Sequence, residues 1–140
     1  MWDFRRGFIW ALILCFSGGA KASSKRQTIQ SSGRSVTYEI FENSTPNVPL
    51  LVFLHGSSGP DSEFYQSQAK FFAGNGYEIL LLHYFDASPS RQPTDQNYHV
   101  WAQALEDLVR ECGVLPSFSG RPIFVVGDSL GASVALAAGS

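Results

Sequence analysis

The chain has 140 residues, 44% of them hydrophobic and 14% aromatic, a composition that fits one packed domain and excludes a disordered chain. Its 10 basic and 12 acidic side chains form no long run of either sign. This balance argues against a nucleic-acid-binding surface or an acidic tail, so we expect no nucleic-acid partner.

Residues 1–22 predict an export signal. Arg5 and Arg6 form a basic start, residues 8–16 are almost wholly apolar, and small residues precede the predicted cleavage site. The apolar stretch is shorter than the roughly 20 residues that span a bilayer. We therefore expect cleavage after Ala22 and a periplasmic or secreted protein without stable membrane insertion. A retained anchor is the alternative, and the arginine pair also resembles a twin-arginine export signal.

Chemistry without a cofactor is expected of the mature chain. Cys15 would leave with the signal, and Cys112 alone cannot form an intramolecular disulfide. The histidines lack the spacing of metal ligands, and no glycine-rich phosphate loop with a following lysine is present. We expect neither a metal nor a cofactor.

The first predicted strand follows a polar leader at residues 23–34, and the domain itself is expected to occupy residues 35–140. Val36, Tyr38 and Ile40 alternate with polar residues. This period of two predicts a strand that is exposed on one face.

Three uninterrupted apolar runs then predict strands that are buried on both faces of a parallel sheet. They are residues 50–54, 79–82 and 123–126. The first run ends in a glycine-rich turn at residues 55–60, and the second leads into a loop at residues 84–94 that is expected to be polar.

Helical patterns separate these strands. Asp61 is expected to cap a helix that ends at residues 74–76. Its apolar surface is expected to come from Phe64, Ala69, Phe71 and Phe72. From about 97 to 111, apolar residues recur at spacings of three and four, which predicts an amphipathic helix. A third helix follows the last strand. The alternation predicts an α/β fold with a mostly parallel sheet, helices on both faces and right-handed crossovers.

The sequence Gly127-Asp128-Ser129-Leu130-Gly131 joins the third apolar run to the third helix. A nucleophile elbow has this setting, because its turn is so tight that the flanking positions, here Gly127 and Gly131, must be small. Such a turn exposes the serine oxygen at the carboxyl end of the strand. We predict that Ser129 is a catalytic nucleophile. The alternative is a chance Gly-x-Ser-x-Gly turn without chemistry.

Two backbone N–H groups are predicted to form an oxyanion hole beside the nucleophile. The first belongs to Leu130, at the positive end of the helix dipole. The second is assigned to Ser57 in the glycine-rich turn, where Gly56 allows a close approach to the substrate. His55 in the same turn is interpreted as a buried histidine that ties down neighbouring loops, not as a proton carrier.

With these features together, residues 35–140 resemble the α/β-hydrolase superfamily, and the segments at 55–60, 77–86 and 127–131 resemble the dienelactone hydrolase family. The resemblance implies an eight-stranded sheet and a nucleophile, acid and histidine in that chain order. It also implies hydrolysis of small-molecule esters or lactones. Dienelactone hydrolases carry cysteine at the position of Ser129, and a serine there suits ordinary ester hydrolysis.

The acid and histidine of this family have no counterpart here, because residues 130–140 contain no histidine, aspartate or glutamate. We expect a C-terminally truncated and essentially inactive hydrolase, since loss of one triad member costs several orders of magnitude in rate. The strand at 123–126 would then be an exposed apolar edge that favours aggregation.

Two other functions stay open. Residues 127–130 also match the signature of the GDSL esterases, but that family carries it near the mature N-terminus, whereas about a hundred residues precede it here. The second alternative is a non-catalytic binding protein on an α/β-hydrolase scaffold, since a fold does not dictate its function.

Overall fold

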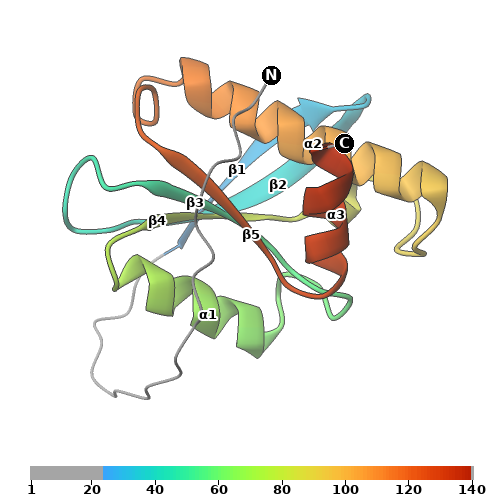
Figure 1. Cartoon of the computed structure of the whole chain (residues 1–140), viewed down its shortest axis with the longest axis horizontal. Coiled ribbons are helices and arrows are strands. Elements are labelled where there is room, and N and C mark those ends of the chain that lie inside the picture. Colours follow the sequence, from blue (N-terminus) through green and yellow to red (C-terminus); the bar gives the residue numbers. More distant parts are fainter. Residues whose placement is uncertain (1–23, 140) are drawn as a thin grey trace.

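A computed structural model describes residues 24–139, in which five strands form one sheet with helices on both faces (Figure 1). The sheet order is β1-β2-β4-β3-β5, and the strands are β1 (Ser24–Ser31), β2 (Arg34–Phe41), β3 (Leu50–Leu54), β4 (Glu78–Leu82) and β5 (Ile123–Gly127). Strand β3 pairs in parallel with β4 and β5, whereas β2 pairs antiparallel with β1 and β4. The predicted α/β architecture is confirmed. The predicted signal peptide lies outside the described residues.

Each face of the sheet has its own core. Helix α1 (Glu63–Ala73) covers one face, and helices α2 (Asp95–Val114) and α3 (Leu130–Ala138) cover the other (Figure 1). The two central strands supply both cores, because successive side chains of a strand point to opposite faces. Thus Phe53 packs in the cluster under α1, whereas Val52 packs in the cluster under α2.

Strands β3 and β4 form the buried centre, as their uninterrupted apolar runs predict. All five residues of β3 are buried, and in β4 only Glu78 at the start of the strand is partly exposed. The carboxyl ends of β3 and β5 lie side by side, since Leu54 pairs with Gly127. Loops that follow parallel strands meet at that edge of a sheet, which is where α/β proteins place their sites.

The segment expected to be a polar leader is corrected by the structure, because most of it forms strand β1. Its residues pair with β2 from Ser24 opposite Phe41 to Ser31 opposite Arg34. The strand reads as polar because it is an edge strand, in which only Ile29 and Ser31 are buried. Polar side chains at such an edge also reduce unwanted pairing with other chains.

Strand β5 is the other edge, and it is not buried as its apolar sequence predicts. The side chains of Phe124, Val125 and Val126 are 51%, 40% and 38% exposed. Its pairing is confined to β3 in the described part of the chain. The expectation that this strand lies at an exposed apolar edge is therefore confirmed.

The helix boundaries differ in detail from the predictions. Ser62, not Asp61, caps α1, since its side chain accepts a hydrogen bond from the N–H of Tyr65. Of the apolar residues expected to pack on α1, Ala69 is buried and Phe72 packs against the core, whereas Phe64 and Phe71 are exposed. Helix α2 begins earlier than predicted and continues through Gly113.

The segment after β4 was expected to be a polar loop, but it begins with a buried 3-10 turn. This turn, η1, spans Tyr84–Ala87, and Tyr84, Phe85 and Ala87 are all buried. The ring of Trp101 from α2 packs on both aromatic rings, at centroid distances of 5.4 and 5.3 Å. Aromatic contacts with a helix distant in sequence therefore hold a segment that reads as a loop.

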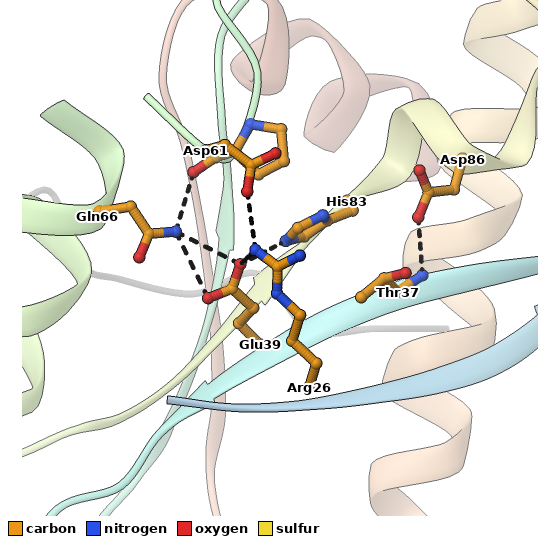
Figure 2. A network of polar contacts seen from close by, with 8 residues as sticks. Arg26, Thr37, Glu39, Asp61, Gln66, His83 and Asp86 are labelled. Atoms are coloured by element: carbon orange, nitrogen blue, oxygen red, sulfur yellow. Dashed lines mark hydrogen bonds and ion pairs between the residues drawn. The ribbon is translucent and has the colours of Figure 1, made fainter. Parts of the chain in front are cut away.

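The buried carboxylate of Glu39 connects strand β2 with β1, with helix α1 and with the residue after β4 (Figure 2). The side chain of Glu39 in β2 is only 2% exposed, and it accepts hydrogen bonds from Arg26 of β1 at 2.8 Å and from Gln66 of α1 at 3.4 Å. Nε2 of His83 lies 2.9 Å from the same carboxylate. Arg26 also binds Asp61, at 2.8 Å. These contacts hold the start of α1 against the sheet.

Candidate functional site

Ser129 lies in the turn between β5 and α3, where its backbone has φ 50° and ψ −113°. A positive φ is rare for a residue with a side chain and costs of order 1–3 kcal/mol, so the surroundings must hold it in place. The residue is exposed and belongs to neither the strand nor the helix. The turn thus presents its hydroxyl at the carboxyl edge of the sheet.

The glycines on both sides of this turn are required by close packing. A Cβ atom on Gly127 would lie 2.5 Å from the backbone of Gly131 and Ala132. A Cβ atom on Gly131 would collide with the carbonyl oxygen of Leu54 and lie 2.7 Å from that of His55. The end of β3 and the turn therefore pack backbone against backbone, and both glycines have to be small, as the tight turn predicted.

The glycine-rich turn after β3 lies directly against Ser129. A Cβ atom on Gly56 would lie 3.4 Å from the Cβ atom of Ser129 and would overlap the hydroxyl of Tyr65. A hydrogen bond of 3.1 Å from the N–H of Gly59 to the carbonyl of Gly56 closes the turn. The structure therefore brings the turn after β3 against the turn after β5, although the two are far apart in the sequence. Both turns lie at the carboxyl ends of parallel strands, where α/β proteins place their sites.

Both predicted donors of the oxyanion hole are unpaired backbone groups. The N–H of Ser57 makes no hydrogen bond within residues 24–139, and the residue is exposed. Leu130 is the first residue of α3, so its N–H has no acceptor inside the helix. The two groups belong to the two segments that meet at Ser129.

His55 is buried and structural, as predicted. It is fully buried, its Nδ1 lies 2.8 Å from the carbonyl oxygen of Gly56, and its ring stacks on Tyr84 at 4.2 Å. The hydroxyl of Tyr84 donates to the carbonyl of His55, at 2.6 Å. Burial lowers the pKa of His55 to about 4, so the ring is neutral near pH 7. A neutral, stacked ring fixes the turn after β3.

Tyr65 is a member of the site that the sequence did not reveal. Its hydroxyl donates to Oδ2 of Asp128, the residue before Ser129, at 2.5 Å. Its side chain is nearly buried, and burial raises the pKa of the hydroxyl above its usual value, with a further rise from Asp128. A tyrosine in the first turn of an amphipathic helix looks like any core residue, so no local signal identifies it.

None of the histidines is hydrogen-bonded to Ser129 in the described part of the chain. His83 binds Glu39, and His99 is exposed on α2. The carboxylate of Asp86 accepts from the N–H of Thr37, at 3.1 Å. These groups serve the structure, as expected from their positions ahead of the turn.

The described residues, 24–139, show neither a metal centre nor a membrane-spanning helix. They contain no cluster of three or more histidine, cysteine, aspartate or glutamate side chains suited to a metal ion. No helix among them combines the length and the apolar character needed to cross a bilayer. Cys112 is a free thiol in the core, where burial raises its pKa to about 11.

Solved structures of α/β hydrolases resemble this chain. The α/β hydrolase GrgF from Penicillium sp. sh18 superposes with a TM-score of 0.68 at 24% identity over 83% of the chain, and an esterase from Pyrococcus furiosus with 0.64 at 22% over 81%. A dienelactone hydrolase from Anabaena variabilis superposes with 0.66 at 14% over 83%. At these identities the likeness shows the fold, and the fold is that of the α/β hydrolases.

The chain spans only part of the structures that it resembles. It covers 41%, 45% and 56% of the Penicillium, Pyrococcus and Anabaena proteins. No protein-family model matches it. The Gly-Asp-Ser-Leu block of this chain follows β5, after two parallel strands, and not the first strand as in the GDSL esterases.

Proposed function

We propose that the chain is the N-terminal part of an exported serine hydrolase that cleaves carboxylic esters or lactones through an acyl-enzyme on Ser129. The observation that carries the proposal is the strained backbone of Ser129, packed against the turn at Gly56. Strain of 1–3 kcal/mol persists where the surroundings enforce it, and it clusters at active sites. The esterase and dienelactone hydrolase among the similar structures support this substrate class.

The proposed reaction forms and breaks two bonds in sequence. Oγ of Ser129 attacks the carbonyl carbon as its proton passes to a base, and the carbonyl oxygen gains the negative charge. The N–H groups of Ser57 and Leu130 stabilise that charge. The intermediate then breaks its bond to the leaving oxygen, which takes the proton back from the base to give the alcohol and leaves an acyl-enzyme. Water, activated by the same base, attacks the acyl carbon, and the acid and the free hydroxyl of Ser129 are released.

The base of this reaction is not provided by residues 24–139, because no side chain among them binds the hydroxyl of Ser129. We therefore propose that the 140-residue polypeptide alone turns over very slowly. Donors of an oxyanion hole still accelerate attack in the absence of the other groups, by roughly a thousand-fold or more over water. This residual effect makes the nucleophile measurable.

The test is covalent labelling of the purified chain by a fluorophosphonate probe, with imidazole added as an external base. We expect slow labelling that imidazole accelerates, and loss of it in Ser129→Ala. Ser133→Ala is the matched control, because Ser133 is an exposed serine in the first turn of α3, four residues after Ser129. It should label like the unmodified chain.

Two results would overturn this function. Equal labelling of the Ser129→Ala variant and the unmodified chain would show that another residue reacts. Absence of labelling at every imidazole concentration would favour a binding protein on the same scaffold.

A further inference from the structure

The hydroxyl of Tyr65 occupies the space between the turn at residues 55–59 and the turn at residues 127–131. The absent side chain of Gly56 creates this space, since a Cβ atom there would overlap the hydroxyl. That Cβ position would also lie 3.4 Å from Oδ2 of Asp128 and 3.4 Å from the Cβ atom of Ser129. Tyr65 therefore contacts both walls of the proposed site.

The body of Tyr65 is held in place by its own helix and by the sheet. Its ring packs edge-on against Phe53 of β3, at a centroid distance of 5.8 Å, and against Phe64, at 5.1 Å. Its N–H is bound by the cap Ser62, and the next residue, Gln66, reaches the buried Glu39 (Figure 2). The hydroxyl is thus a fixed point rather than a rotating group.

The turn at residues 127–131 is also tied to the end of β3, by a hydrogen bond of 3.0 Å from the N–H of Asp128 to the carbonyl of Leu54 and by the close packing of Gly131 on that strand end. Ser57 and Ser58 are exposed, and the turn that holds them is closed by the bond between Gly59 and Gly56. Asp128 is also exposed, and among the described residues its side chain accepts a hydrogen bond from Tyr65 alone. The contact of Tyr65 with Asp128 and with Gly56 adds a side-chain tie between the two turns to these backbone contacts.

We propose that Tyr65 is a positioning residue that sets the distance between the two turns, so that the N–H groups of Ser57 and Leu130 face the same substrate oxygen. This inference rests on the proposed function of Ser129. Misplacement of reacting groups by about 1 Å can cost a factor of about 100 in rate, so a tie of this kind has a measurable effect.

A direct role in binding the oxyanion does not fit the geometry. A phenol has a single O–H hydrogen, and that of Tyr65 is donated to Asp128. The hydroxyl cannot donate to a substrate oxygen at the same time. Tyr65 acts on the reaction through the position of its neighbours.

The test measures fluorophosphonate labelling of Ser129 in the presence of imidazole and separates the maximal rate, kinact, from the apparent binding constant, KI. Tyr65→Phe keeps the ring and removes the hydroxyl, so we expect kinact to fall by about 10-fold or more with little change in KI. Asp128→Ala should give the same loss. Asp128→Asn should recover most of the rate, because its amide oxygen still accepts a hydrogen bond.

The double variant of Tyr65→Phe and Asp128→Ala should be no slower than either single variant, because both remove the same contact. Tyr77→Phe is the matched control. Tyr77 lies just before β4, at the amino ends of the parallel strands and away from Ser129, so its substitution should leave kinact unchanged.

The outcomes separate this inference from the function on which it rests. An unchanged kinact in Tyr65→Phe or Asp128→Ala, with Ser129→Ala unlabelled, overturns the role of Tyr65 and leaves the nucleophile in place. A change confined to KI, or an equal loss in Asp128→Asn, overturns it as well. If Tyr65→Phe does not fold, as judged by circular dichroism, Asp128→Ala decides, because Asp128 is exposed.

Discussion

At the scale of single residues, the site depends on backbone contacts that only glycine permits. Gly127 and Gly131 pack against backbone atoms, whereas Gly56 leaves room for the hydroxyl of Tyr65. The strained φ of Ser129 is compatible with the fold because these three positions have no side chains. A methyl group at any of them would move the turn or its neighbours.

Substitution of glycine by alanine is predicted to have opposite effects at two positions. Gly131→Ala should destabilise the chain by about 1–3 kcal/mol or more, because its Cβ atom meets the backbone of Leu54 and His55. Gly113→Ala, in α2, should stabilise it by about 1 kcal/mol, because the position is open and helical. Urea unfolding measures the change in the free energy of unfolding for both variants. Equal changes would contradict the close contact of Gly131 with the end of β3.

The buried ring of His55 predicts a pH dependence of stability. Its pKa is about 4 in the folded chain and has the ordinary value of 6.5 when unfolded, because burial disfavours the charged ring. Between these values the unfolded state binds more protons. The contribution of neutral His55 to the free energy of unfolding is therefore complete above pH 6.5. It is lost as the pH falls from 6.5 towards 4, by about 3 kcal/mol in total.

Urea unfolding between pH 7.5 and 4.5 tests this dependence by comparison with His55→Gln. The variant should be less stable at pH 7.5, but its stability should fall less steeply with decreasing pH. His99→Gln is the control, because His99 is exposed. Parallel curves for the unmodified chain and His55→Gln would show that His55 titrates normally.

At the scale of elements, helix α1 is fixed at its N-terminal end by consecutive residues with different partners. Tyr65 reaches Asp128 in the turn after β5, and Gln66 reaches Glu39 in β2. Glu39 also binds β1 through Arg26. A carboxylate with this little exposure is tolerated because its oxygens are bound on several sides.

Two carboxylates in and beside β2, Glu39 and Glu42, are predicted to differ in their effect on stability. Glu39→Ala should cost about 2–3 kcal/mol, because it leaves His83 buried without a partner. Glu42→Ala should cost less than about 1 kcal/mol, because the Lys25–Glu42 pair is exposed on both sides. Thermal and urea unfolding of both variants provide the measurement. Similar losses would mean that the Glu39 network adds little.

At the scale of the whole molecule, the sheet is polar at one edge and apolar at the other. Strand β1 carries exposed polar side chains, whereas β5 exposes Phe124, Val125 and Val126. Unpaired backbone groups beside exposed apolar side chains promote pairing between molecules. The 140-residue chain should therefore associate through β5.

Phe124→Lys is predicted to reduce this association, because a charge on an edge strand opposes edge-to-edge pairing. Static light scattering against protein concentration should show less aggregate, with an unchanged circular dichroism spectrum. The control is Phe64→Lys on α1, since Phe64 is 57% exposed and Phe124 51%. An equal reduction in both variants would indicate a general effect of charge.

Patterns within a single segment were sufficient for much of this fold. The apolar runs predicted β3 and β4, and the periodic apolar residues predicted the buried face of α2. The turn at residues 127–131 was predicted from its two glycines. Each of these features depends on residues that are close in sequence, such as the flanking groups of a tight turn.

Features that depend on distant partners were not predictable in this way. Strand β1 forms because its polar residues pair with β2, and η1 is buried because Trp101 covers it. Tyr65 and Asp128 are far apart in the chain, and their contact exists because the sheet places β5 beside β3. No pattern within one segment contains that information.

The sequence by itself determined the alternation of strands and helices from β2 onward, the buried centre of the sheet and the serine at the sharp turn. Only the tertiary structure decided which edge each strand occupies, which buried polar groups meet and which tyrosine lies beside Ser129. The physical reason is that local periodicity reflects which face of an element is buried. Which residues pack on that buried face depends on the order of the strands and on contacts between segments that are distant in sequence.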